Sequence, residues 1–182
     1  MEFALLPGTA SGTLRRFCRC GGAPMTRLSE WVGRFRAVLF CPEHLALVKE
    51  GPAARRAFLD SALSQLYPAY LASLQRYHAI LRQRSALLHT QRMLGGSAED
   101  AVFVRQMEVW SEQLAREAAY LAVQRSEYAE KLGRDAADVM EAMSGGAEKL
   151  TLRAAEPLSE REYLRKLTGE LSRELRMGST QY

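Results

Sequence analysis

The sequence predicts an α+β fold that is mainly α: a small β-rich part, an antiparallel helical arm of coiled-coil type, then a short strand and a return helix. Three observations predict it. Short apolar runs between turn residues fill the first fifty positions, helical spacing dominates from Pro52 onward, and a Gly-Gly pair separates two long helical stretches. The expected divisions of the chain are 1–50, 51–145 and 146–182.

The β-rich part is predicted from extended runs bounded by turn residues. Residues 2–6 and 13–20 are two such runs, and Gly21-Gly22 supplies the turn after the second. A short helix is expected over 26–31, where a threonine can cap its first turn. The apolar run 36–40 fits a buried strand.

Two breaks in a helical pattern predict the arm. Residues 53–66 form one helix that ends at Tyr67, because the residue before a proline disfavours the helical conformation. Pro68 opens a second helix that runs to about residue 94, where Gly95-Gly96 ends it. At 1.5 Å per residue this helix is roughly 40 Å long, and the short loop after it predicts an antiparallel hairpin.

The third helix is predicted to begin with a capping-box-like Ser97-x-x-Asp100, and Gly133 is expected to bend it before Met143. Apolar or small residues recur at steps of three and four, with one gap at Arg125, which predicts a coiled-coil seam. The residues of this seam are Phe103, Met107, Trp110, Leu114, Ala118, Leu121, Tyr128 and Leu132. The matching stripe of the preceding helix is Leu71, Leu74, Tyr77, Leu81 and Leu88.

The C-terminal part reads as a strand and a helix. Residues 148–153 alternate as a strand does, and Pro157 followed by Ser159-x-x-Glu162 starts a last helix that runs to about Met177. Residues 178–180 lead out in an extended conformation.

Composition restricts the class of protein. The 182 residues are 47% hydrophobic and 25% charged, and no window approaches 18 uninterrupted apolar residues, which excludes a transmembrane helix. Three cysteines, an odd number, favour a reducing cytoplasm over a disulfide framework. We therefore expect a cytoplasmic protein without a membrane partner.

The charge is unevenly distributed, and this suggests an anionic partner. Residues 1–95 carry 13 Lys and Arg against 5 Asp and Glu, whereas 96–182 carry 12 against 16. Over 57–95 there are four arginines and a single acid, so few intrahelical partners can neutralise them. Unpaired arginines on a helix suit a phosphate backbone. The candidate DNA-binding residues are Arg55, Arg56, Arg82, Arg84 and Arg92.

Two local motifs can be interpreted either as functional sites or as ordinary structural features. Ser144-Gly145-Gly146 mimics the core of an ABC-type signature, but no helix is predicted after the glycines to bind a phosphate, which favours a plain turn at a helix end. Cys18-x-Cys20 with Cys41-x-x-His44 could supply four zinc ligands, although one residue between cysteines is too short a spacing for a usual zinc site. A phosphate-binding loop is excluded, because no Gly-Lys pair occurs in the chain.

Several spaced segments resemble RecF, an ABC-type, SMC-like family of DNA replication and repair proteins. The longest is VLFCPEHLALVKEGPAARRAFLD at 38–60, and LRQRSALL at 81–88 follows it in order. Shorter matches are RLSE at 27–30, EKLTL at 148–152 and RMGST at 176–180. Three positions depart from the family pattern: His44 stands in place of Asp, Glu50 in place of Gly, and Ser85 in place of Asn. The chain resembles an internal fragment of RecF, in which Met1 is an internal start.

The resemblance implies a function and a set of partners. A complete RecF protein binds gapped double- and single-stranded DNA in an ATP-dependent manner, dimerises around ATP and Mg, and works with RecO and RecR to load the recombinase. Residues 1–50 would then be part of an ATPase lobe, and Glu43 would lie in its Q-loop, where a polar side chain senses the metal and the γ-phosphate. Because the family's P-loop, signature and Walker B parts are missing, we expect this chain alone to bind no ATP and to be inactive as an ATPase. The alternative is a non-enzymatic helical module that binds proteins and not nucleic acid.

Overall fold

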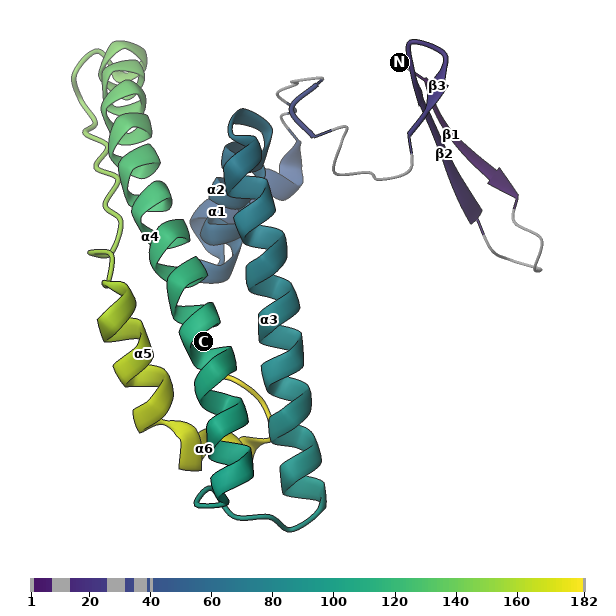
Figure 1. The fold of residues 1–182 in the computed structure, drawn as a ribbon. Coiled ribbons are helices and arrows are strands. Elements are labelled where there is room, and N and C mark those ends of the chain that lie inside the picture. Colours follow the sequence, from purple (N-terminus) through teal and green to yellow (C-terminus); the bar gives the residue numbers. More distant parts are fainter. Residues whose placement is uncertain (1, 8–13, 26–31, 35–38, 40, 182) are drawn as a thin grey trace.

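The computed structural model describes residues 2–7, 14–25, 32–34, 39 and 41–181. It confirms the predicted α+β class with a strong excess of helix (Figure 1). The elements in chain order are β1 (Glu2–Pro7), β2 (Leu14–Cys20), β3 (Ala23–Pro24), the 3₁₀ turn η2 (Pro42–Leu45), α1 (Ala46–Lys49), α2 (Pro52–Leu66), α3 (Pro68–Met93), α4 (Ala101–Ser144), α5 (Glu160–Gly169) and α6 (Leu171–Met177). The helix expected over 26–31 and the strand expected over 36–40 lie outside the described residues, apart from Leu39.

The N-terminal strands form a small antiparallel sheet in the order β1-β2-β3. Phe3 lies opposite Cys18 in the register of β1 and β2, and Cys20 lies opposite Ala23 across the next turn. Gly21 and Gly22 make that turn with φ values of +58° and +83°, a conformation that two-residue hairpin turns favour and that other residues rarely adopt. Both extended runs predicted from the sequence therefore form strands.

Prolines set the starts of α2 and α3. Pro52 and Pro68 occupy first-turn positions, where a missing N–H costs nothing, and Tyr67 between the two helices has extended backbone angles. After α3, Gly95 adopts a positive φ and the chain turns back into α4. α3 and α4 run antiparallel side by side, which is the predicted hairpin (Figure 1).

The cap of α4 differs from the prediction. Asp100, not Ser97, is the N-cap, because its carboxylate accepts hydrogen bonds from the backbone N–H groups of Val102 and Phe103, both at 2.9 Å. The helix then continues through Gly133 to Ser144 without ending there. A Cβ at Gly133 would lie 3.2 Å from Cβ of Leu152, so this glycine permits the close approach of a later segment.

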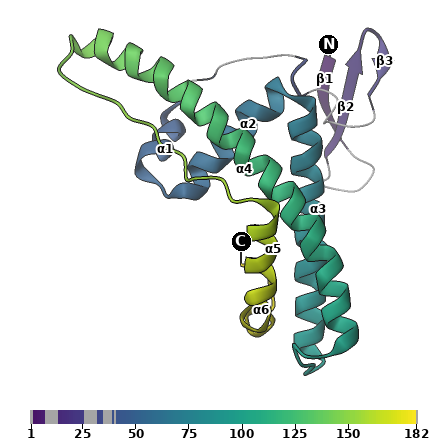
Figure 2. The ribbon, with the colours of Figure 1, turned by 60° about the vertical axis from the view of Figure 1, so that its left-hand side comes forward.

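The segment after α4 is extended but forms no strand. Residues 148–159 pair with no neighbouring strand and run back alongside α4, as Figures 1 and 2 both show. The strand predicted over 148–153 is therefore wrong, since alternation alone supplies no partner for its backbone. The last helix also differs: it is divided at Glu170 into α5 and α6, and α5 packs on α4 while α6 packs on α3.

The core is a row of three apolar clusters along the hairpin. Leu63, Tyr70 and Leu121 form the cluster beside α2, Ile80, Leu114, Ala115 and Leu167 form the middle one, and Leu88, Phe103, Met107 and Leu175 form the one near the hairpin loop. The predicted seam of α4 is confirmed for the residues that are buried, namely Phe103, Met107, Leu114, Ala118 and Leu121.

The buried stripe of α3 includes the predicted Leu88, but at three other places it lies one residue before the predicted position. Its buried residues are Tyr70, Ser73, Ile80, Arg84 and Leu88, whereas Leu71, Leu74, Tyr77 and Leu81 are only partly buried. Two of the five buried positions carry polar side chains, which hydrophobic spacing cannot detect. The correct phase of α3 decides which of its arginines reach the surface.

Candidate nucleic-acid interface

α3 contains no acidic residue over its 26 positions. It carries Arg76, Arg82, Arg84 and Arg92, and its surface charge is decided by which of these have partners. Arg82 is exposed and makes no ion pair or hydrogen bond within the described part of the chain. Arg82 therefore presents an uncompensated positive charge to solvent.

Arg76 is exposed but paired across the hairpin. Its Nε lies 2.6 Å from Oε1 of Glu117 on α4, and Nη2 donates a second hydrogen bond to Oε2 at 3.1 Å. Ser73 donates a further hydrogen bond to the same carboxylate at 2.5 Å. Burial alone would raise the pKa of Glu117, but the hydrogen bonds from Arg76 and Ser73 outweigh it and hold that pKa below its usual value. This acid is therefore already neutralised by its partners.

A second acid close to α3 is neutralised in the same way. Asp60 on α2 accepts hydrogen bonds from Nε of Arg125 at 2.7 Å and from Nη2 at 2.9 Å, a bidentate pair. Tyr70 donates a hydrogen bond to Asp60 as well. Burial and the bond to Asp60 raise the pKa of Tyr70, which stays protonated. At the position where Arg125 interrupts the apolar seam, polar side chains therefore connect α2, α3 and α4.

The third acid is buried inside the hairpin. Glu174 on α6 is 1% exposed, and its Oε2 lies 2.6 Å from Nη1 of Arg84, which is fully buried. Arg84 also donates hydrogen bonds to Ser111 at 3.1 Å, to Thr180 at 2.9 Å and to the Leu167 carbonyl at 3.2 Å. The prediction that Arg84 contacts DNA does not agree with this placement, since the guanidinium has no surface to offer. Arg84 instead connects α3 with α4, α5, α6 and the segment after α6.

The remaining predicted arginines are at the surface. Arg92 is exposed, and its Nη1 donates a hydrogen bond to the Met177 carbonyl at 3.1 Å, near the C-terminal end of α6. Arg55 is exposed and donates hydrogen bonds to the carbonyls of Leu47 and Glu50 at 3.1 and 3.4 Å. Arg56 is exposed on the same first turns of α2. Because backbone carbonyls leave a net positive charge, these arginines still contribute to a basic surface.

For Glu43, the predicted cofactor-binding residue, the structure describes the backbone alone. Its backbone lies in η2, and its side chain lies outside the described part of the chain. No phosphate-binding loop exists in the sequence, and no group of three or more His, Cys, Asp and Glu residues in the described ranges could hold a metal. Cys20 and Cys41 are free thiols, and the side chain of Cys18 is outside the described part.

Ser144-Gly145-Gly146 is the end of a helix. Gly145 has a left-handed φ of +61°, and the N–H groups of Gly145 and Gly146 both donate to the Glu141 carbonyl. This is the usual C-terminal cap of a helix. The amides are used by α4 itself, so the resemblance to a phosphate-binding signature has no structural counterpart here.

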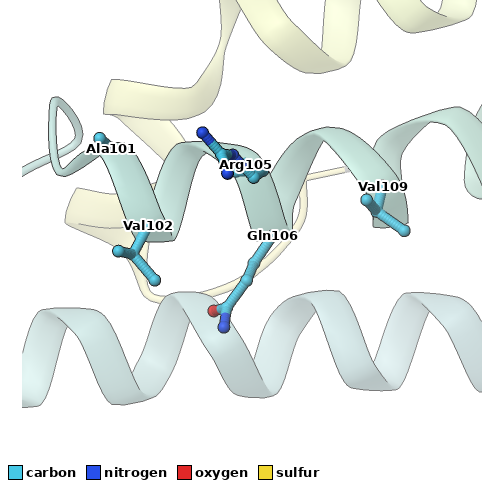
Figure 3. Close-up of a pocket in the computed structure, with 5 residues that line it drawn as sticks. All are labelled: Ala101, Val102, Arg105, Gln106 and Val109. Atoms are coloured by element: carbon cyan, nitrogen blue, oxygen red, sulfur yellow. The ribbon is translucent and has the colours of Figure 1, made fainter.

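A shallow apolar groove lies on the first turns of α4. It is lined by Ala101, Val102, Arg105, Gln106 and Val109, and Figure 3 shows Val102 and Gln106 projecting from one side of α4 and Arg105 from the other. No set of polar groups converges in it, as catalytic sites require. Among the described residues, no helix combines the length and apolar character that crossing a membrane would need.

Sequence reasoning missed three of the polar partners: Asp60, Glu117 and Glu174. A signal existed for one of them, because Arg84 is in phase with Ile80 and Leu88 and therefore had to be buried with a partner. The partner itself lies 90 positions away in sequence, and nothing local points to it.

The fold and the surface together define a mainly helical α+β chain with an antiparallel arm whose first long helix is basic. No family model matches the chain. Individual curated proteins are similar to it in sequence, and they are named DNA replication and repair protein RecF. The protein from Thermomicrobium roseum is 42% identical over 125 residues, which is 69% of this chain and 30% of that protein. The protein from Halothermothrix orenii is 44% identical over 104 residues, 57% of this chain and 26% of that protein.

A solved structure agrees with these relatives. The recombination mediator protein RecF of the RecFOR pathway, solved with ATP and with ATPrS, superposes with a TM-score of 0.75 and 28% identity. The match covers 92% of this chain and 46% of that protein. The resemblance to RecF that the sequence indicated is therefore confirmed in sequence and in fold. The chain spans about a third or less of the curated relatives and less than half of the solved protein.

Proposed function

We propose that this chain serves a RecF-type protein of DNA replication and repair as part of its DNA-binding surface. Exposed arginines of α2 and α3 would contact the phosphate backbone: Arg55, Arg56, Arg82 and Arg92. In the complete RecF-type protein this surface would act in ATP-dependent binding of gapped DNA and in loading of the recombinase. The partners there would be RecR- and RecO-type proteins and a second RecF copy, in the cytoplasm.

One observation carries the proposal. α3 has no acid of its own, and three acids on the helices that pack against it are each held by an arginine: Asp60 by Arg125, Glu117 by Arg76 and Glu174 by Arg84. The negative charge of these three acids is therefore neutralised by ion pairs within the chain. What remains at the surface of α3 is positive, which favours a polyanion.

The test is the salt dependence of DNA binding by the whole chain. Fluorescence anisotropy with a labelled gapped duplex, at 50 to 200 mM salt, should show an affinity that falls steeply as salt rises. Arg82→Ala should weaken binding and reduce the slope of log K against log salt by about one. Arg134→Ala is the matched control, because Arg134 is an exposed arginine already paired with Glu130 on α4, at 2.8 Å. Binding that ignores salt and Arg82 would contradict the proposal.

ATP belongs to the complete protein in this proposal, where binding of ATP with Mg would close the dimer and hydrolysis would reopen it. Within this chain Glu43 is the residue that we expect to lie near them. The purified chain should show no ATP turnover, since its sequence holds no phosphate-binding loop. Turnover in this chain that persists after Glu43→Gln and extensive purification would contradict this part of the proposal.

The alternative function, a helical module that binds proteins, is favoured by apolar residues at the hairpin loop. Met93, Leu94 and Val102 are 71%, 77% and 69% exposed. Exposed apolar side chains that lie together commonly mark protein contacts. A complex with purified RecR or RecO that persists at high salt, and that Leu94→Ser abolishes while Arg82→Ala does not, would favour this alternative.

A further inference from the structure

Two histidines share the outward side of α3 with Arg82. Gln75, His78, Arg82, His89 and Met93 are all exposed and recur at intervals of three, four and seven residues or their sums. At 3.6 residues per turn these positions lie on one stripe, opposite the buried residues of the same helix. We call this set the outward stripe. His78 and His89 were not among the residues that charge alone suggested.

Within the part of the chain that the structure describes, neither His78 nor His89 forms an ion pair. Of the helices that pack on α3, α2 carries Arg55, Arg56 and the paired Asp60, and α6 carries the buried Glu174 with exposed Arg173 and Arg176. On α4, Glu117 is paired with Arg76, and Arg125 with Asp60. The other charged residues of α4 are all exposed: Arg105, Glu108, Glu112, Arg116, Glu127, Glu130, Lys131, Arg134, Asp135, Asp138 and Glu141.

The length of the outward stripe fits a nucleic-acid backbone. His89 lies eleven positions after His78, and at 1.5 Å per residue this is about 16 Å. Duplex DNA carries one phosphate charge per about 1.7 Å of its axis, so several phosphates lie along such a distance. Imidazole changes its charge near pH 6.5, and a phosphate placed against it favours the protonated form.

We propose that His78 and His89, with Arg82 between them, contact the phosphate backbone of DNA and make the affinity of this surface dependent on pH. The inference rests on the proposed DNA binding and adds residues and a regulating variable to it. Protonation adds two positive charges to a helix that already lacks acids. Affinity for DNA therefore rises as pH falls from 7.5 to 6.0.

The experiment is anisotropy with a labelled gapped duplex at pH 7.5 and 6.0, at constant salt, using the whole chain. The wild-type chain should bind roughly tenfold more tightly at pH 6.0 than at pH 7.5, because each protonated histidine adds a positive charge that contacts a phosphate. His78→Gln/His89→Gln should reduce that change to less than twofold. His44→Gln is the matched control, since His44 is the third histidine of the chain and lies on η2, not on α3.

Variants that keep a permanent positive charge at both positions give a second, independent test. His78→Arg/His89→Arg should bind more tightly than wild type at pH 7.5 and should lose the pH response. At pH 6.0 the slope of log K against log salt should be steeper for wild type than for the double glutamine variant by about two. Circular dichroism at both pH values verifies that each variant folds, and all of these positions are exposed.

The outcomes separate the two hypotheses. A double glutamine variant that keeps the full pH response overturns the role of the histidines and leaves DNA binding by the arginines intact. A wild-type chain without salt-dependent DNA binding at either pH overturns both. Loss of the pH response in the double variant, with retention in His44→Gln, supports the inference.

Discussion

Arg84 and Glu174 form an ion pair inside the arm, with Nη1 2.6 Å from Oε2 and side chains that are 0% and 1% exposed. Oε2 accepts no well-aligned hydrogen bond within the described residues, so its interaction with Nη1 is a charge contact. Oε1 accepts a hydrogen bond from the Gln181 backbone at 3.0 Å, and Ser85 accepts one from Thr180 at 3.2 Å. Two of the segments that carry the resemblance to RecF, 81–88 and 176–180, therefore meet at this pair.

Glu174→Ala should lower the free energy of unfolding by about 3–5 kcal/mol, because it leaves the Arg84 charge buried without a partner. The double variant Arg84→Met/Glu174→Leu should lose less than this single variant, since no charge remains to desolvate. Urea denaturation followed by circular dichroism measures both. Arg173→Ala is the surface control: Arg173 is 65% exposed beside Glu170, and its loss should change stability by less than about 0.5 kcal/mol. A double variant less stable than Glu174→Ala would contradict this account.

The pair of Arg84 and Glu174 also illustrates which features of the fold could be predicted from the sequence and which could not. Helix boundaries at Pro52, Pro68 and Gly95 were predictable because proline and glycine act locally through backbone geometry. The phase of α3 was not, because Ser73 and Arg84 occupy buried positions and hide the apolar stripe. Their acidic partners, Glu117 and Glu174, are 44 and 90 positions distant, and only the folded chain brings them together.

The candidate interface was predictable in part for a related reason. An excess of arginine over acid is visible in the sequence, and Arg82 is exposed as expected. Arg84, two positions further along the chain, is not, because a difference of two residues turns a side chain by about 200° around a helix. Charge counting cannot separate these two residues, whereas the phase of the buried stripe does.

Asp60 and Arg125 should couple in a double-mutant cycle. Asp60→Asn removes the charge but keeps the shape, and we expect it to lower the free energy of unfolding by about 1.5–3 kcal/mol, as for hydrogen bonds to charged groups. In a background that already carries Arg125→Met, the same change should cost much less, because the bidentate partner is gone. Chemical denaturation of the four proteins gives the coupling energy. A coupling near zero would mean that the tie between α2 and α4 contributes no stability.

The Glu117 carboxylate should make the arm sensitive to acid. Its pKa in the folded chain is below the usual 4.5, so near pH 4 the unfolded chain binds more protons than the folded chain. This contribution to stability is present above pH 4.5 and is lost as pH falls through the lower, folded value. In denaturation at pH 7 and at pH 3, the difference in unfolding free energy between wild type and Glu117→Gln should shrink at pH 3. Glu108→Gln, at an exposed position of the same helix, is the control that should show no such change.

The start of α4 gives a test that separates the predicted cap from the observed one. Asp100 accepts two backbone hydrogen bonds of the first turn, while the Ser97 hydroxyl accepts one from Glu99, before the helix begins. Asp100→Ala should lower the free energy of unfolding by about 1 kcal/mol, which is typical for loss of an N-cap, and its loss also removes a negative charge from the positive end of the helix dipole. Ser97→Ala should lower the free energy of unfolding by only a few tenths of the loss in Asp100→Ala, since Ser97 caps no helical turn. Thermal and urea denaturation measure both losses. A larger loss of stability in Ser97→Ala than in Asp100→Ala would contradict the observed cap and support Ser97 as the N-cap.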